Sequence, residues 1–198
     1  KVTAVRDGKV IAEHEGEQLE IPFDKLLVSV GRRAVTDGLG LETVGVELQR
    51  GAIVVDEHLE TSVPGIYAVG DVNGVSMLAH TAAREGQVAV HHITDYPDAM
   101  SYRAIPGIVY TDPEIASVGQ TEQELRTAGV DYQVHRVPMS LSGRFVIENE
   151  QGNGFCKLLT DSEGVILGAH MLGNGSSEIL VPAIMAVEQR MTLTELAR

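Results

Sequence analysis

The chain of 198 residues is 43% hydrophobic and 22% charged, a balance typical of a globular protein with a substantial core. Its formal net charge of −13 argues against nucleic acids and anionic membrane surfaces as partners. Because it has neither an apolar run of transmembrane length nor a basic start followed by a hydrophobic signal segment, we expect a soluble, cytoplasmic protein.

The first part of the chain predicts an antiparallel meander followed by a buried strand. Apolar residues alternate on either side of Asp7-Gly8, and a central Asp-Gly pair is a strong hairpin signal. A further strand is expected before Ile21-Pro22. Residues 24–30 form a nearly continuous apolar run, of the kind that is buried on both faces of a sheet. Arg32 and Arg33 follow this run, and such arginines are more often solvated than bound to a phosphate.

A strand, a Gly-Asp pair and a helix follow one another in the middle of the chain. After a predicted turn of helix within 37–49 and a strand at 53–56, the short apolar run Ile66–Val69 predicts a buried strand that ends at Gly70-Asp71. Apolar residues at helical spacing then predict a helix from Leu78 to Ile93.

This order of elements places the Asp71 carboxylate where open α/β sheets bind ligands, at the carboxyl end of a strand and beside a helix start. The carboxylate can accept hydrogen bonds from sugar-like hydroxyls. The free N–H groups at Met77, Leu78 and Ala79 suit an anionic or electron-rich group. Taken alone, a Gly-Asp pair after a strand is more often a plain turn and helix cap, and a lone histidine such as His80 is usually a cap or surface residue.

Beyond a boundary near residue 100, the pattern changes to that of an α+β domain. Thr121 and Glu124 predict a capping box at a helix start, and a polar, Gly-rich loop or an irregular hairpin is expected between 141 and 154. Strands are predicted at 105–110, 115–118, 132–138, 155–160 and 165–172. An amphipathic helix is predicted at 177–190, with an apolar side made of Ile179, Leu180, Ala183, Ile184 and Val187.

Cys156 is the only cysteine, which excludes disulfide frameworks and cysteine-based metal sites. It lies in the predicted strand 155–160, and we interpret it as a small buried side chain rather than a nucleophile. We predict no metal site and no catalytic residue within this chain.

Several stretches of this chain are similar to those of one enzyme family. They are TSVPGIYAVGD at 61–71, MLAH at 77–80, YTDPEIASVG at 110–119, GFCKLLTD at 154–161 and ILGAHMLG at 166–173. With these motifs, the chain resembles the FAD-dependent pyridine nucleotide-disulfide oxidoreductases over nearly its whole length. The MLAH segment favours the members that oxidise dihydrolipoamide, with mercuric and glutathione reductases as the alternatives.

The resemblance implies a mixed fold, α/β and α+β. The tail of an NAD-binding domain would occupy 1–33, a segment of the Rossmann-like FAD-binding domain 34–100, and an α+β dimerisation domain 101–198. The expected partners are a second copy of the chain, in a homodimer, and the E2 component of a 2-oxo acid dehydrogenase complex.

The same resemblance implies FAD and NAD as cofactors. Asp71 would bind the FAD ribityl chain, and the backbone of Met77, Leu78 and Ala79 would face the flavin pyrimidine edge, with His80 near the cofactor. The intact enzyme would oxidise dihydrolipoamide and pass the electrons through FAD to NAD+.

Several features of the family's chemistry are missing from this chain. It has no redox cysteine pair, no Gly-x-Gly-x-x-Gly after a strand and no His-Pro-Thr motif. We therefore expect an internal or carboxyl-side fragment, which supplies part of the flavin site and the dimer interface and cannot turn over lipoamide alone. A non-catalytic dimerisation module is the alternative hypothesis, since residues 104–198 have the size of an independent domain.

Overall fold

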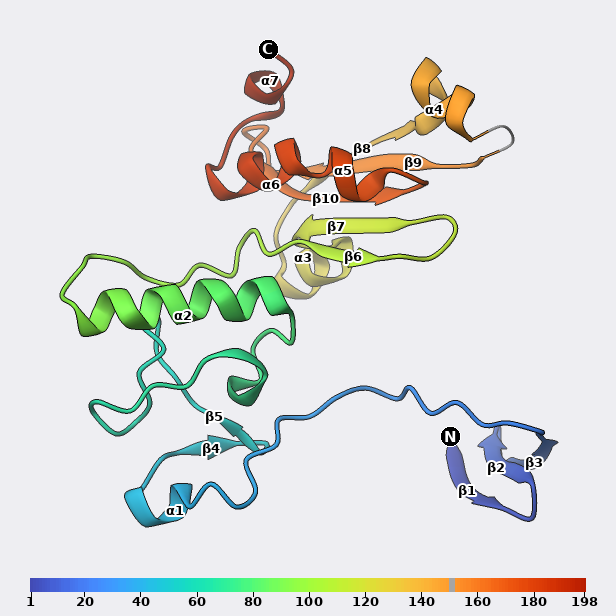
Figure 1. Cartoon of the computed structure of the whole chain (residues 1–198). Helices are drawn as coiled ribbons and strands as arrows, with labels where there is room; N and C mark the ends of the chain where they lie inside the picture. Colours follow the sequence, from blue (N-terminus) through green and yellow to red (C-terminus); the bar gives the residue numbers. More distant parts are fainter. Residues whose placement is uncertain (150–151) are drawn as a thin grey trace.

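The computed structural model describes residues 1–149 and 152–198. Figure 1 shows a small sheet near the N-terminus, a central part built around one long helix, and a larger sheet toward the C-terminus. An extended segment without regular secondary structure, residues 23–36, joins the small sheet to the central part.

The small sheet is the predicted antiparallel meander. Its strands are β1 (Val2–Arg6), β2 (Lys9–His14) and β3 (Glu17–Pro22), paired in the order β1-β2-β3. Asp7 and Gly8 have φ angles of 53° and 69°, the left-handed conformation that a tight two-residue hairpin turn requires. The prediction from the Asp-Gly pair is therefore confirmed.

The prediction of a strand at residues 24–30 is wrong. This segment has no regular secondary structure, and Leu27 and Val30 are 90% and 91% exposed. An apolar run forms a buried strand only where neighbouring strands hydrogen-bond to its backbone. Within the described residues, none of the strands pairs with residues 24–30. The apolar side chains of this segment are therefore left largely exposed.

The central part contains the predicted long helix and the predicted short one. Its elements are α1 (Leu41–Val44), β4 (Leu48–Gln49), β5 (Ala52–Ile53), the 3₁₀ turn η1 (Gly70–Asn73) and α2 (Ala79–Ile93). The strand expected at 53–56 is shortened to the two residues of β5, which pair with β4.

Ile66–Val69, predicted as a strand, is extended but forms only an isolated bridge between Tyr67 and Glu60. Its backbone finds partners nearby, because the chain doubles back at Pro64-Gly65. The Thr61 N–H donates to the Ile66 carbonyl at 2.8 Å, and the Ala68 N–H donates to the Leu59 carbonyl at 3.0 Å. Local pairing thus takes the place of a longer sheet.

The larger sheet contains all five strands predicted beyond residue 100. They are β6 (Gly107–Val109), β7 (Ile115–Gly119), β8 (Gln133–Pro138), β9 (Phe155–Thr160) and β10 (Ile166–Leu172). The strand order is β6-β7-β10-β9-β8, and every neighbouring pair is antiparallel.

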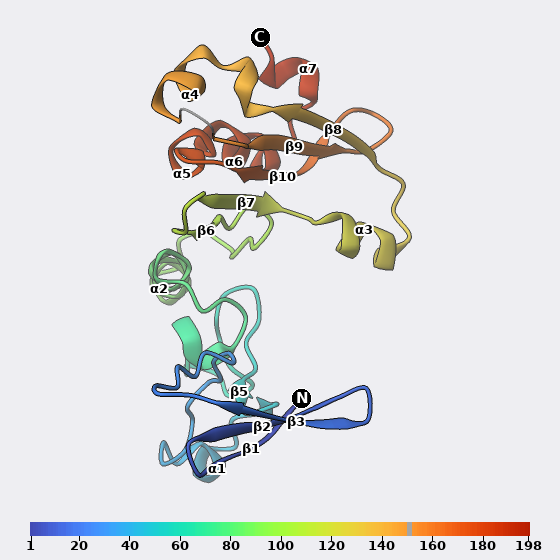
Figure 2. The same ribbon diagram turned by 90° about the vertical axis from the view of Figure 1, so that its right-hand side faces the viewer.

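Two consecutive helices, α5 (Ser176–Ile179) and α6 (Val181–Glu188), replace the single helix predicted at 177–190. They pack against one face of the sheet, beside β7 and β10 (Figure 2). Pro182, at the first turn of α6, is well placed where a new helix begins. The buried apolar residues here are Leu180, between the two helices, and Ala183, Ala186 and Val187 of α6. Ile179, predicted on the apolar inner side, is 53% exposed, because α5 ends there.

Four shorter helical segments complete this part of the chain. The loop predicted at 141–154 contains the end of the 3₁₀ turn η2 (Met139–Leu141) and a helix, α4 (Gly143–Glu148), which the Ser142 side chain caps. The loop prediction is therefore wrong for residues 143–148. Residues 150–151 of the predicted loop lie outside the described residues. The last helix, α7 (Leu193–Leu196), begins with a capping box at Thr192.

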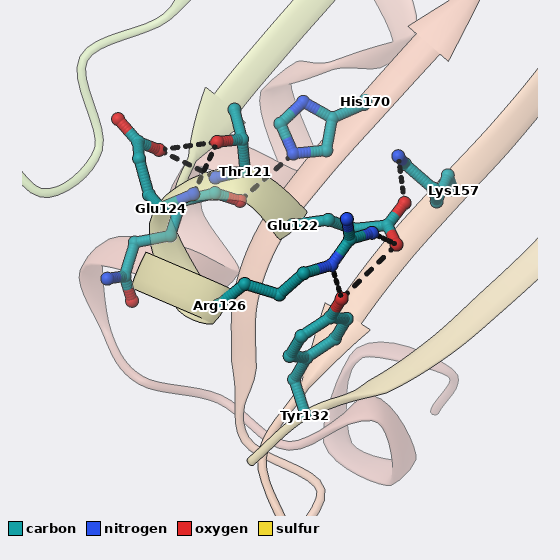
Figure 3. A network of polar contacts seen from close by, with 8 residues as sticks. Thr121, Glu122, Glu124, Arg126, Tyr132, Lys157 and His170 are labelled. Carbon is teal, nitrogen blue, oxygen red and sulfur yellow. Dashed lines mark hydrogen bonds and ion pairs between the residues drawn. The ribbon is translucent and has the colours of Figure 1, made fainter. Parts of the chain in front are cut away.

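Helix α3 (Glu122–Ala128) begins at the predicted capping box of Thr121 and Glu124, which is confirmed. It is tied to strand β9 by a network of charged and polar groups (Figure 3). Glu122 accepts hydrogen bonds from Lys157 Nζ at 2.7 Å and from Arg126 Nη2 at 3.1 Å. These cations, Lys157 first, lower the pKa of the Glu122 carboxyl.

We expect the Glu122–Lys157 pair to stabilise the fold at neutral pH and to lose its contribution in acid. A carboxyl whose pKa is lowered on folding stabilises the folded state above its unfolded pKa, and this stabilisation disappears as the pH falls through the lower, folded pKa. The free energy of unfolding of Lys157→Met should therefore lie below that of the unmodified chain at neutral pH, and the difference should shrink below about pH 4. Urea denaturation over a pH series measures it, and a difference that grows in acid would contradict the argument.

Candidate functional site

The predicted site lies where η1 meets the first turn of α2. Val69 is extended, Gly70 has a φ of 80°, and Asp71 lies in the 3₁₀ turn that follows. The Asp71 side chain is exposed, whereas Gly70 and Asn73 are buried. The turn thus presents one carboxylate to the outside while its backbone is anchored to the protein.

The start of α2 is open on the same part of the chain. Leu78, the residue before the helix, is extended, and within the described residues no side chain caps the helix N-terminus. Met77 is half-buried, while Leu78, Ala79 and His80 are exposed. The first N–H groups of a helix carry partial positive charge, so this end can bind an electron-rich group.

A buried carboxylate holds η1 against α2. Glu85 is fully buried, and its Oε2 accepts hydrogen bonds from the Gly70 N–H at 2.6 Å and from Asn73 Nδ2 at 2.9 Å. Its Oε1 accepts a hydrogen bond from the Tyr102 hydroxyl at 2.8 Å. The sequence analysis did not identify this residue.

One signal in the sequence could have identified Glu85. The buried positions of α2 are Thr81, Glu85, Val88 and Ala89. Glu85 lies four residues after Thr81 and three or four before Val88 and Ala89, as on one helical face, so a glutamate interrupts the stripe that faces the protein. A charged residue on such a stripe is unusual and requires partners.

His80 has a contact that the sequence did not predict. Its Nε2 lies 3.0 Å from the Pro106 carbonyl oxygen, so the side chain joins the start of α2 to the segment that leads into β6. This contact is structural, and it leaves the backbone of the helix start open.

An open cleft of about 570 Å³ adjoins the turn and the segment before α2. Its lining includes three arginines, Arg32, Arg33 and Arg50, together with Asn73 and Met77. Arg33 makes one long ion pair, with Asp37 at 3.8 Å, between two highly exposed side chains. Arg50 was not identified from the sequence.

A second polar cluster fixes the far half of α2 to the linker that follows it. Arg84 donates to both carboxylate oxygens of Asp98, at 2.8 and 2.6 Å, and His91 Nδ1 lies 2.7 Å from Asp98 Oδ2. The hydrogen bonds from Arg84 and His91 hold the pKa of the Asp98 carboxyl well below its usual range. This cluster positions the linker, since both helix side chains contact the Asp98 carboxylate.

Cys156 is partly buried in β9, and burial raises the pKa of its thiol. A raised pKa disfavours the reactive thiolate, as expected for a packing residue. Among the described residues, His, Cys, Asp and Glu side chains form no group of three or more that could hold a metal ion. In the same residues, no helix combines the length and apolar character that crossing a membrane requires.

Two family models match this chain. One, described as "Pyridine nucleotide-disulphide oxidoreductase", matches residues 1–86. The other, described as "Pyridine nucleotide-disulphide oxidoreductase, dimerisation domain", matches residues 105–198. Together they account for most of the sequence, on either side of the segment that links α2 to β6.

Curated relatives and solved structures agree with these matches. Dihydrolipoyl dehydrogenase of Geobacillus stearothermophilus is 42% identical over 194 residues, which cover 96% of this chain and 41% of that protein. The Halobacterium salinarum protein of the same name is 39% identical over 199 residues, which cover 98% and 42%. The chain therefore spans about two fifths of the length of these relatives.

Similarity to solved structures extends over nearly the whole chain. The crystal structure of LpdA from Mycobacterium tuberculosis superimposes with a TM-score of 0.81 at 32% identity, covering 97% of this chain and 42% of that one. The HOCl-induced flavoprotein disulfide reductase RclA from Escherichia coli superimposes with a TM-score of 0.76 at 28% identity, covering 96% and 44%.

Proposed function

Because the chain belongs to the pyridine nucleotide-disulphide oxidoreductase family, we propose that it supplies one wall of the flavin site and the dimerisation surface of a dihydrolipoyl dehydrogenase. The observation that supports this most is the pairing of an exposed carboxylate, Asp71, with the uncapped start of α2. Names of relatives favour this member of the family over mercuric and glutathione reductases.

The residues at this site fit an FAD molecule. Asp71 offers exposed acceptor oxygens, which suit the hydroxyl groups of a ribityl chain. The backbone N–H groups around Met77, Leu78 and Ala79 offer donors and a partial positive charge, which suit the electron-rich pyrimidine edge of the flavin. His80 would lie beside this edge, with its ring held by Pro106.

Within the proposed enzyme, the bound FAD would supply the electron transfer between dihydrolipoamide and NAD+. This chain's residues bind and orient the cofactor. Asp71 fixes the ribityl chain, and the helix dipole of α2 stabilises negative charge on the pyrimidine edge. The single thiol, Cys156, takes no part, because thiol-disulfide chemistry needs an attacking thiolate and a second sulfur.

The proposed partners follow from the dimerisation domain. We assign residues 101–198 to the contact between two copies of the chain in a homodimer. Residues 1–33 would belong to the NAD-binding domain, and residues 34–100 to the FAD-binding domain. The enzyme would serve the E2 component of a 2-oxo acid dehydrogenase complex, in the cytoplasm. In this proposal, the chain's large negative charge keeps nucleic acid off its surface.

Replacement of Asp71 by alanine tests the flavin site. In the full-length protein, stripped of cofactor and titrated with FAD, Asp71→Ala should weaken FAD binding by roughly 10-fold to 100-fold, the usual value of hydrogen bonds to a charged group. Quenching of flavin fluorescence measures the dissociation constant.

Asp131→Ala is the matched control, because it removes an exposed aspartate from the loop before β8, remote in sequence from the turn. It should bind FAD as the unmodified protein does. Equal FAD affinity in Asp71→Ala and the control would refute the assignment of Asp71.

A non-catalytic dimerisation module is the second candidate function. One observation favours it: the core formed mainly by β7, β10, α4 and α6 is made of residues from Ala104 onward and needs no contribution from the first hundred. If the 198-residue chain dimerises in light scattering and the full-length protein binds no FAD, this candidate is the better account.

A further inference from the structure

Glu85 is an unusual residue for the position that it occupies. It is fully buried in the middle of α2, on the stripe that faces the protein, and burying a charge is costly unless donors surround it. Here two donors, the Gly70 N–H and the Asn73 amide, come from the turn η1, and the third, the Tyr102 hydroxyl, comes from the linker before β6. The glutamate therefore orders segments that would otherwise be free to move.

Both bonds to Oε2 act on the turn that carries Asp71. Gly70 lies immediately before Asp71, and its N–H donates to Glu85 at 2.6 Å. Asn73 lies two residues after Asp71, and its amide has a fixed orientation, because Oδ1 accepts the Val75 N–H at 3.0 Å while Nδ2 donates to Glu85. The aspartate is thus held on both sides by one carboxylate.

The turn also packs closely against α2, which limits how it can move. Gly70 has a left-handed φ of 80°, and a Cβ there would lie 3.3 Å from the Ala82 side chain, so the turn packs directly on α2. Because the turn is in such close contact with α2, Asp71 can reorient only if the bonds from Gly70 and Asn73 to Glu85 break.

The third bond reaches beyond the turn. Tyr102 belongs to the linker that leads into β6, and its hydroxyl donates to Glu85 Oε1 at 2.8 Å. Burial, and next the bond to Glu85, raise the pKa of Tyr102, so the phenol keeps its proton and donates throughout the physiological range. Glu85 is thereby a junction between the Asp71 turn and the segment that enters the dimerisation domain.

We propose that Glu85 is a positioning residue for the flavin. Its buried carboxylate holds the Gly70–Asn73 turn so that Asp71 faces the cofactor, and its bond to Tyr102 links that turn to the dimerisation domain. The proposal rests on the flavin site described above, and it assigns to Glu85 no contact with the cofactor itself.

A double-mutant cycle tests this role. In the full-length protein, FAD affinity is measured for Glu85→Met, Asp71→Ala and the double variant. Methionine has a similar length but no oxygen, so it accepts none of the three bonds, whereas the oxygen of a glutamine could still accept both bonds from the turn. We expect Glu85→Met to weaken FAD binding by about 10-fold. In the Asp71→Ala background the same change should have an effect of less than about 2-fold, because its action passes through Asp71.

A merely structural role gives a different pattern. If Glu85 only stabilises the fold, its effect on FAD affinity is the same with and without Asp71, and additive losses overturn the proposal. Unchanged FAD affinity in Glu85→Met also overturns it. If Asp71→Ala itself leaves FAD binding unchanged, the proposed flavin site fails first, so the two failures are distinguishable.

Two further variants keep the test decisive. Should Glu85→Met not fold, Asn73→Ala removes one donor to the same carboxylate and is placed in the same cycle, with the same expectations. Tyr102→Phe removes only the bond to the linker. Amide hydrogen exchange at Gly70 and Asp71 should accelerate in Tyr102→Phe if the junction is real, and unchanged exchange would remove the link to the dimerisation domain from the proposal.

Discussion

Replacing Gly168 by alanine should lower the free energy of unfolding of the dimerisation domain by about 3 kcal/mol or more. Gly168 lies in β10, the central strand of the sheet, opposite Gly119 of β7. A Cβ at position 168 would overlap the backbone carbonyl oxygen of Gln120 and lie 3.0 Å from its nitrogen. Because the obstructing atoms belong to the backbone, no side-chain rotation can relieve the overlap.

The overlap would damage more than one contact. The Gln120 N–H donates to the Leu167 carbonyl at 2.9 Å, and His170 Nε2 lies 3.0 Å from the Gln120 carbonyl oxygen. Moving Gln120 away from Gly168 breaks both contacts and displaces the connection from β7 to α3. The network of Glu122, Arg126 and Lys157 begins directly after this connection, so it should loosen as well (Figure 3).

Urea denaturation followed by far-ultraviolet circular dichroism measures this effect. Gly143→Ala is the matched control, because position 143 begins α4 and a Cβ there would meet nothing within 4 Å. It should change the free energy of unfolding by about 1 kcal/mol at most, in the stabilising direction. If Gly168→Ala lies within about 0.5 kcal/mol of the unmodified chain, the close approach of the two backbones is not a constraint.

Local signals in the sequence predicted most elements of this fold. The Asp7-Gly8 pair gave the hairpin, and Thr121 with Glu124 gave the start of α3, because each signal acts on its own few residues. The failures at 24–30 and at Ile66–Val69 share one cause. Both runs have the composition of buried strands, but a strand also needs neighbours, and composition does not supply them.

The candidate site was predictable only where local sequence signals define it. Asp71 and the start of α2 follow from the order of a Gly-Asp pair and a helix, and their role toward FAD stays a prediction. Glu85 and Tyr102 are 17 residues apart and meet only in the folded chain. In the sequence, only the place of Glu85 on the inward stripe of α2 indicates its burial, and its donors become visible only in three dimensions.

A glutamate in place of Met185 should separate the proposed homodimer. Met185 and Val181 lie four residues apart on the outer face of α6, where they are 61% and 53% exposed. The inner face of the same helix is buried against the sheet, with Ala183 and Ala186 at 3% and 0% exposure. A helix that is apolar on both faces is expected to be covered on both, and Ile179 of α5 extends the outer apolar surface.

Burying an unpaired carboxylate costs several kcal/mol, so Met185→Glu should weaken dimerisation by roughly 100-fold or more. Sedimentation equilibrium over a concentration series measures the dissociation constant. Met185→Leu should keep the dimer, because it preserves volume and apolar character. Gln123→Glu, which adds the same charge to an exposed position of α3, should keep it as well.

The two charged variants together separate a local effect from a general one. Both add one negative charge to a chain that already carries −13, so general repulsion between copies should weaken them equally. A contact through α6 weakens only Met185→Glu, because only there is the new carboxylate removed from water. If both variants dimerise as the unmodified chain does, the outer face of α6 lies outside the interface, and the dimer must form through another surface of the dimerisation domain.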